Sequence, residues 1–193
     1  MLVGVLALQG DFAEHASMLA RLGAQVREVR LPADLDGLDG LVLPGGESTT
    51  IGKLATDYGL IEPLRQFGQA HAIYGTCAGA IFLSKDAERQ QPLLGIMDIT
   101  VERNAYGRQV ESFDVSVDVP ALHGLAPGDP PVRAVFIRAP LIKSVSGEAR
   151  ALASLPDGRI IAAQQGKLLA TAFHPEISGD DRFHRYFLQL AGN

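Results

Sequence analysis

The first half of the chain alternates short apolar runs with segments whose apolar residues repeat at helical spacing. A continuous apolar run is typical of a strand covered on both faces, and a repeat every three or four residues is typical of a helix with one buried side. Asp11 and Ser48 precede two of the helical repeats as predicted N-caps, and Gly23 follows the first repeat as a stop. Strands and helices therefore alternate, which predicts a parallel, doubly wound α/β sheet. The strands are predicted at 2–9, 25–30, 40–43 and 71–74, and the helices at 12–22, 51–58 and 78–85.

The second half consists of shorter alternating segments separated by glycine and proline turns. Alternation of apolar and polar residues is typical of strands with one solvated face, and the turn cluster at 127–131 is interpreted as a surface loop. We expect these strands to extend the parallel core as antiparallel additions within a single domain that spans residues 1–193. They are predicted at 98–103, 109–119, 132–137, 151–155 and 159–164, with a last apolar strand at 167–173.

Composition narrows the class of protein. Of the 193 residues 47% are apolar and 20% are charged, and the net charge of −5 argues against a nucleic-acid or anionic membrane partner. A single cysteine allows no internal disulfide, and the apolar N-terminal run lacks a basic leader and is too short to span a bilayer, so a cytoplasmic location is expected. Neither a metal site nor a cofactor is predicted, because several histidines have neither ligand-like spacing nor a cysteine partner. These histidines are His71, His123 and His184.

The one cysteine, Cys77, lies between two glycines in Gly75-Thr76-Cys77-Ala78-Gly79, where a predicted strand ends and a helix begins. A nucleophile on such a strand–turn–helix corner needs strained backbone angles and neighbours without Cβ atoms. The positive end of the following helix favours a thiolate over a thiol. Cys77 is therefore a candidate nucleophile, and the alternative is a buried cysteine that serves as a small apolar side chain.

A glycine-rich loop, Pro44-Gly45-Gly46-Glu47-Ser48-Thr49-Thr50, directly follows another predicted strand. Loops at the carboxyl ends of strands carry the functional sites of open α/β sheets. A phosphate-binding P-loop is excluded, because five residues separate Gly46 from Gly52 and Leu54 stands where Ser or Thr is needed. The loop instead predicts an oxyanion site built from its backbone N–H groups and that of Ala78, with a plain glycine turn as the alternative.

His174-Pro175-Glu176 follows the last predicted strand. We interpret it as extended backbone, because a residue before proline favours that geometry and residues two apart in a strand face the same side. The Glu176 carboxylate would then select the tautomer of His174 and stabilise its cation. Together with the corner at Cys77, this pair predicts a Cys–His–Glu triad and not a structural histidine.

These motifs resemble the class I, or triad, glutamine amidotransferases. Further runs narrow the resemblance, over essentially the whole chain, to the family of glutaminase subunits of pyridoxal 5′-phosphate synthase. The resemblance implies a flavodoxin-like three-layer fold, in which a mixed, mostly parallel sheet has helices on both faces. The runs are Leu8-Gln9-Gly10-Asp11 with Glu14-His15, Pro44 to Thr50, Val101-Glu102-Arg103-Asn104 with Gly107-Arg108-Gln109, and Phe136-Ile137-Arg138-Ala139-Pro140.

The family resemblance also implies the reaction, which is hydrolysis of L-glutamine to L-glutamate and ammonia. Cys77 would attack the side-chain amide, and the N–H groups of Gly46 and Ala78 would hold the oxyanion. His174 would protonate the departing ammonia and then activate water on a γ-glutamyl thioester, with Glu176 orienting the ring. The residues implied to bind glutamine are Gly45, Gly46, Glu47, Ser48, Arg103, Ile137 and Arg138.

A partner follows from the same resemblance. It is a (β/α)₈-barrel synthase subunit that would receive ammonia through a channel, within a large hetero-oligomer, and make pyridoxal 5′-phosphate (vitamin B6) from sugar phosphates. Gln9 and the helix carrying Glu14 and His15 would border that contact, where a solvated helix face is the alternative. Other functions remain open: the glutaminase subunit of another biosynthetic amidotransferase, a γ-glutamyl hydrolase or cysteine peptidase, and a non-catalytic module with the same fold.

Overall fold

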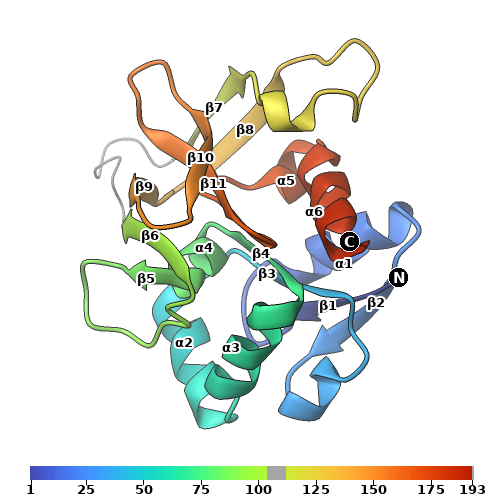
Figure 1. Cartoon of the computed structure of the whole chain (residues 1–193), viewed down its shortest axis with the longest axis vertical. Coiled ribbons are helices and arrows are strands. Elements are labelled where there is room, and N and C mark those ends of the chain that lie inside the picture. The colour runs from blue at the N-terminus through green and yellow to red at the C-terminus, as the bar shows by residue number, and fades with distance from the viewer. Residues whose placement is uncertain (104–111, 193) are drawn as a thin grey trace.

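A computed structural model describes residues 1–103 and 112–192 and shows a mixed sheet between helices (Figure 1). Its parallel strands are β1 (Leu2–Leu6), β2 (Gln25–Val29), β3 (Gly40–Leu43), β4 (Ala72–Thr76) and β12 (Leu168–Thr171). The strands that extend them are β5 (Ser84–Asp86), β6 (Met97–Glu102), β9 (Leu141–Val145), β10 (Arg150–Ser154) and β11 (Ile160–Gln165). A separate antiparallel pair is formed by β7 (Ser112–Val117) and β8 (Val132–Ile137). The helices are α1 (Phe12–Arg21), α2 (Ser48–Asp57), α3 (Ile61–Ala70), α4 (Ala78–Leu83), α5 (Pro175–Ser178) and α6 (Arg182–Gly192), with 3₁₀ turns η1 (Pro32–Leu35) and η2 (Pro120–Leu122).

The main sheet has the strand order β2-β1-β3-β4-β12-β11-β9-β6-β5, with β10 paired to β11. The first five strands are parallel, and the direction reverses between β12 and β11. Every residue of β3, β4 and β12 is buried, because helices cover both faces, and this is why these strands are continuous apolar runs in the sequence. The predicted α/β fold with a mostly parallel sheet is confirmed, and the carboxyl ends of β1, β3, β4 and β12 share one edge.

The helices form layers on opposite sides of the sheet. The chain moves one way along the sheet through β1, α1 and β2, and the other way through β3, α2, α3 and β4. Right-handed crossovers in opposite directions place their helices on opposite faces. In Figure 1, α1 and α6 lie together on one side and α2 and α3 on the other, which gives the predicted three layers. Within the described ranges, no helix has the length and apolar character that crossing a bilayer requires.

Two predicted helix caps differ from the structure. Helix α2 begins at Ser48, and its cap is Glu47, whose carboxylate accepts the N–H groups of Thr49 at 3.2 Å and Thr50 at 2.7 Å. The prediction that Ser48 caps this helix is therefore wrong, because the helix begins at Ser48 itself and the Glu47 side chain, one residue earlier, accepts the N–H groups of its first turn. Asp11 does precede α1, but its side chain makes no capping hydrogen bond.

The second half contains the predicted antiparallel strands, although not all of them join the main sheet. Strand β8 has the predicted bounds, and β6, β10 and β11 lie within one residue of theirs. Strands β7 and β8 pair with each other in a two-stranded sheet, where Phe113 stacks on Phe136, so the prediction that these strands extend the parallel core is wrong. The start of the predicted strand at 109–119, and the motif residues Asn104, Gly107, Arg108 and Gln109, lie outside the described residues. Helices α3 and α6 and strands β5 and β9 are absent from the prediction.

Candidate active site

Cys77 occupies the corner between β4 and α4 that the sequence predicts. Its backbone has a φ of 48° and a ψ of −104°, a strained conformation for a residue with a side chain. The neighbouring glycines leave no room for a Cβ: on Gly75 it would lie 2.6 Å from the carbonyl oxygen of Gly79, and on Gly79 it would lie 2.0 Å from that of Leu43. The corner therefore packs directly on the end of β3, which fixes the position of the sulfur atom.

This close contact predicts a large loss of stability in Gly79→Ala. The added methyl group meets the Leu43 backbone, which cannot move aside as a flexible side chain can, so we expect the free energy of unfolding to fall by about 3 kcal/mol. Urea unfolding of the variant and the parent protein measures it. The matched control is Gly192→Ala, another helical glycine, where the added methyl meets only the flexible Met1 side chain at 3.2 Å. Equal unfolding midpoints for the two variants would contradict this account of the corner.

His174 and Glu176 meet Cys77 from the carboxyl end of β12. The backbone N–H of His174 donates to the carbonyl oxygen of Val135 in β8 at 2.8 Å. Its ring lies beside Cys77 in the wall of one cavity, and its Nδ1 lies 2.7 Å from Oε1 of Glu176. The predicted extended backbone is wrong beyond His174, because Pro175 is the first residue of α5. Proline favours the first helical position, and the helical turn, not a strand, returns the carboxylate to the ring.

The charges around His174 favour its imidazolium form. Burial alone would lower the pKa of His174, but hydrogen bonds and charge interactions with Cys77 and Glu176 raise this pKa to about 10. A protonated ring at neutral pH is a suitable partner for a thiolate and a proton donor for a leaving group. Asp11 places a second carboxylate 3.7 Å from Nδ1. Ligand atoms of Asp11, His174 and Glu176 lie within 4.8 Å of one another, but the Nδ1 that a metal ion would need already binds Glu176.

A cavity of about 510 Å³ opens in front of the sulfur atom. Most of the residues predicted to bind substrate or to act in catalysis line it. Two do not: Glu176 lies behind His174, and Gly45 supports the ring, since a Cβ on Gly45 would lie 2.6 Å from Cε1 of His174. The lining residues are Gln9, Asp11, Gly46, Glu47, Ser48, Cys77, Ala78, Ile81, Arg103, Ile137, Arg138, Pro140, His174 and Ile177.

The glycine-rich loop is held by the segment that follows β1. Oε1 of Gln9 accepts the N–H of Glu47 at 2.7 Å, and the N–H of Asp11 donates to the carbonyl oxygen of Gly45 at 3.1 Å. Gln9 and Asp11 also line the cavity, a role that was not predicted from the sequence. The sequence carries one indication of this role, because Gln9 comes soon after strand β1. In the sheet β1 lies beside β3, and the glycine-rich loop follows β3. Gly46 has a φ of 146°, which turns this part of the loop towards Gln9.

A charged network closes one side of the cavity. The guanidinium of Arg103 donates to Oε1 of Glu47 at 2.8 Å, and also to Thr49 and to Gln91. Burial works against the charged form of Glu47, but the hydrogen bonds from Thr50, Thr49 and Arg103 lower the pKa of Glu47 to about 2. The cavity thus carries a fixed carboxylate, and Arg103 and Arg138 contribute positive charge.

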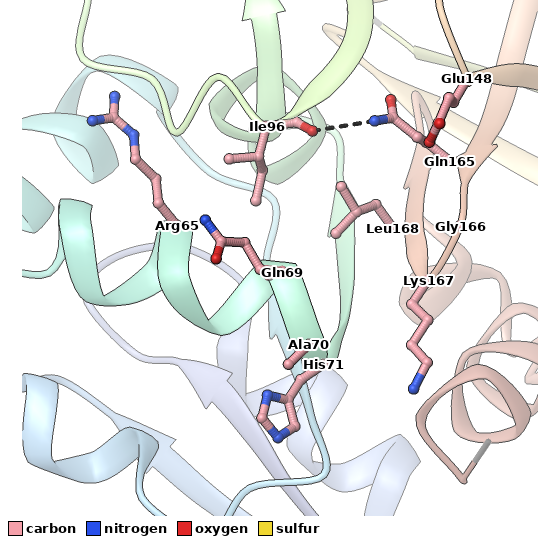
Figure 2. A pocket seen from close by; sticks show the side chains of 11 residues that line it. Arg65, Gln69, Ala70, His71, Ile96, Glu148, Gln165, Gly166, Lys167 and Leu168 are labelled. Atoms are coloured by element: carbon pink, nitrogen blue, oxygen red, sulfur yellow. Dashed lines mark hydrogen bonds between the residues drawn. The ribbon is translucent and has the colours of Figure 1, made fainter.

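A second hollow, of about 520 Å³, lies at the opposite end of the sheet (Figure 2). It is bordered by His71, which precedes β4, and by Gly166 and Lys167, which precede β12. Arg65 and Lys167 also line it, and Gln165 donates to the carbonyl oxygen of Ile96 at 3.5 Å. The active-site cavity instead lies at the carboxyl ends of these strands, where functional sites of open α/β sheets are found.

Comparison with known proteins agrees with this geometry. The chain resembles a solved structure described as a glutamine amidotransferase, with a TM-score of 0.90 and 48% identity over 99% of both chains. A solved structure of PurLQS from Thermotoga maritima shares the fold at a TM-score of 0.70, with 15% identity over 97% of both chains. Sequence relatives described as pyridoxal 5′-phosphate synthase subunit PdxT include one from Deinococcus radiodurans, 57% identical over 100% of this chain and 98% of the relative. Another is from Roseiflexus sp. (strain RS-1), 54% identical over 98% of this chain and 100% of the relative.

The fold, with a cysteine corner facing a histidine–glutamate pair, is that of the glutamine amidotransferases. The sequence model of the SNO glutamine amidotransferase family matches residues 5–192. The chain belongs to the SNO glutamine amidotransferase family.

Proposed function

We propose that the chain, acting as one glutaminase domain, hydrolyses L-glutamine and supplies the ammonia to a synthase subunit that makes pyridoxal 5′-phosphate. The observation that carries this proposal is the cavity wall, where Cys77 on its strained corner lies beside the His174 ring that Glu176 orients. The relatives described as synthase subunits support the identity of the product. The proposed reaction needs no metal or cofactor, since thiolate, imidazolium and water supply every group that reacts.

The reaction balances with these groups alone. The Cys77 thiolate attacks the side-chain amide carbon of glutamine, and the negative oxygen that forms is held by the N–H groups of Gly46 and Ala78. The C–N bond breaks as the His174 imidazolium gives its proton to nitrogen, which leaves as ammonia. Water then attacks the thioester while neutral His174 takes its proton. Glutamate leaves, and the thiolate–imidazolium pair is restored, with Glu176 holding the ring throughout.

The charges of the cavity suit the other end of glutamine. We propose that Glu47 pairs with the α-ammonium group and that Arg138 pairs with the α-carboxylate, because a guanidinium binds a carboxylate through two parallel hydrogen bonds. Arg103 would act mainly through Glu47, which it already binds. Gly45, Ser48 and Ile137 complete the proposed substrate site.

Arg138→Ala should raise the KM for glutamine about 10-fold to 100-fold with little change in kcat, since one charge-assisted contact to bound substrate is lost. Steady-state glutaminase kinetics measure both constants. Arg133→Ala is the matched control, because Arg133 lies on β8, which ends immediately before Arg138, but pairs with Asp114 on the exposed surface. A KM that stays at the parent value in Arg138→Ala would remove this residue from the substrate site.

The rim of the cavity supports docking of the synthase. Ile137 and Ile177 line the cavity and remain 40% and 48% exposed, respectively, so two large apolar side chains border the same polar site in contact with solvent. We propose that the partner is a (β/α)₈-barrel subunit, that it covers this rim within a large hetero-oligomer, and that both subunits work in the cytoplasm. Covering the rim would keep ammonia from escaping into solvent.

Glutaminase activity should therefore depend on the partner. We expect slow release of glutamate by the chain alone and a rise of about 10-fold or more when the synthase is added in excess, because docking would complete the active site. A titration of partner against a fixed amount of chain, with glutamate measured, tests this. Full activity without the partner would contradict the proposed coupling.

The choice of substrate distinguishes a glutaminase from a γ-glutamyl hydrolase that uses the same triad. Free glutamine and a γ-glutamyl dipeptide can be compared at equal concentration in the presence of the synthase. Preference for free glutamine supports the glutaminase, because the charged groups of the cavity fit an amino acid. Preference for the dipeptide would indicate a γ-glutamyl hydrolase.

A further inference from the structure

Behind Glu176, polar side chains from four separate elements form a buried chain. Nε2 of His15, in α1, lies 3.1 Å from Oγ1 of Thr76 at the end of β4, and 3.5 Å from Oε2 of Glu176 in α5. Nδ1 of His15 lies 2.9 Å from Nε2 of His184 in α6. His15 and His184 are completely buried. His15 therefore points into the protein, and of the two residues expected on an outer helix face, only Glu14 is exposed.

His15 and His184, the two histidines of this buried group of polar side chains, are neutral at physiological pH. Burial, followed by the charges of His184 and His174, holds the pKa of His15 well below its usual value. Burial lowers the pKa of His184 to about 4. A neutral imidazole has one N–H donor and one nitrogen acceptor, so each ring can donate in a single direction. The charged groups that act on His184 are Asp181, Asp180 and Arg21.

The hydrogen-bond pattern determines which of the two rings, His15 or His184, donates to the other. Within the described part of the chain, Nδ1 of His184 and Oε2 of Glu176 are buried and have no hydrogen-bond partner of normal geometry. If His15 donated to His184, then Nδ1–H of His184 would be a buried donor without an acceptor, and a ring lone pair would face the Glu176 carboxylate. Both are costly. In the opposite arrangement His184 donates to His15, and Nε2–H of His15 points at Thr76 and Glu176. The unpartnered atom of His184 is then merely an acceptor.

We propose that His15 is a positioning residue for the catalytic carboxylate: its Nε2–H, fixed by His184, holds Oε2 of Glu176 while Oε1 of Glu176 holds His174. The proposal rests on the proposed function. It explains why the end of β4 carries a hydroxyl at Thr76, since Oγ1 shares the N–H that faces Glu176. The contact places the orientation of His174 under the control of α1 and α6, two helices that lie outside the cavity.

The charged surroundings of Glu176 determine what loss of His15 should do. Its carboxylate faces His174 and, through the same cluster, Asp11. It also lies near Tyr74 of β4, whose pKa burial raises well above its usual value. His15 is the donor that the structure places against Oε2. Without this donor the carboxylate is held less firmly against His174 and stabilises its cation less, so the pKa of His174 should fall from about 10 and the enzyme should lose activity at a lower pH on the alkaline side.

His15→Leu tests the proposal, with His15→Gln as the conservative variant whose side-chain amide can place an N–H near the position of Nε2. Both are assayed as full-length chains with the synthase, with kcat, KM and the pH dependence of kcat/KM measured. We expect His15→Leu to lower kcat about 10-fold to 100-fold. KM for glutamine should stay constant, because His15 does not line the cavity, and the alkaline limb should move to lower pH. His15→Gln should recover most of kcat and return the alkaline limb towards the parent position.

Two further variants keep the test decisive if His15→Leu folds poorly. His184→Phe keeps a ring but removes the donor to Nδ1 of His15, and should move kcat and the alkaline limb in the same direction by a smaller amount. Met18→Ala, one turn along α1 and also buried, should lower the thermal midpoint without moving the alkaline limb.

Equal loss of kcat in His15→Leu and His15→Gln would show that the ring acts by packing alone and would overturn the proposal. An alkaline limb that stays in place in both His15→Leu and His184→Phe would do the same. Failure of the proposed function is distinguishable from both results, because the parent protein itself would then release no glutamate from glutamine.

Discussion

Replacing Cys77 by alanine should abolish glutamine hydrolysis while leaving the fold intact. No other cysteine exists in the chain, and the thiolate forms the covalent bond to substrate, so the loss should reach the order of 10⁴-fold or more in kcat. Fold stability should change little, because the substitution removes one atom that borders the cavity and keeps the backbone geometry of the corner. Glutamate release with the synthase present measures activity, and thermal unfolding measures the fold.

Glutamine binding provides the control for Cys77→Ala. The groups proposed to bind the α-ammonium and α-carboxylate of glutamine are unchanged, so calorimetry should still detect binding of glutamine by the inactive variant. Residual turnover within about 10-fold of the parent rate would mean that another group attacks the amide, and the assignment of the nucleophile would have to be abandoned.

Glu176→Gln should have the second largest effect, a fall in kcat of about 10³-fold to 10⁴-fold, because the amide cannot stabilise the His174 cation and no longer selects its tautomer. The pH profile should change with it. Interaction with Glu176 is one of the causes that raise the pKa of His174 to about 10, so removing the charge lowers this pKa. His174 then loses the proton needed by the leaving ammonia at a lower pH, and the alkaline limb of the profile moves down.

The control for Glu176→Gln is the same chemical change at Glu62, whose carboxylate is exposed and pairs with Arg65 one turn away in α3. Glu62→Gln should keep both kcat and the pH limbs of the parent. If Glu176→Gln retained the parental alkaline limb, the carboxylate would not be acting on His174.

Local patterns in the sequence predict most of the frame of this site. The strand–turn–helix corner at Cys77 follows from two glycines and a change of periodicity, and the structure explains both glycines by backbone contacts. The bounds of β3 and β8 agree with their apolar patterns. The spacing of His174 and Glu176 predicts their contact, although the reason differs, since a helical turn and not a strand brings them together.

Contacts between distant segments are what the sequence does not reveal. His15 and His184 are 169 residues apart and touch because α1 and α6 pack on the same side of the sheet. No spacing rule connects them, so each appears as an isolated histidine. Gln9 likewise reaches Glu47 across 38 residues, because β1 and β3 are neighbours in the sheet. Both contacts arise from strand order and helix packing, which are decided by the whole fold.

The covalent intermediate is the most direct test of the account. The chain and the synthase are mixed with glutamine, quenched in acid during turnover, and studied by mass spectrometry after proteolysis. We expect one glutamyl group on the peptide that contains Cys77, lost as glutamate is released and absent from Cys77→Ala. Release of glutamate with no adduct on this peptide in a quench series, or a glutamyl group on another residue, would contradict the proposed reaction.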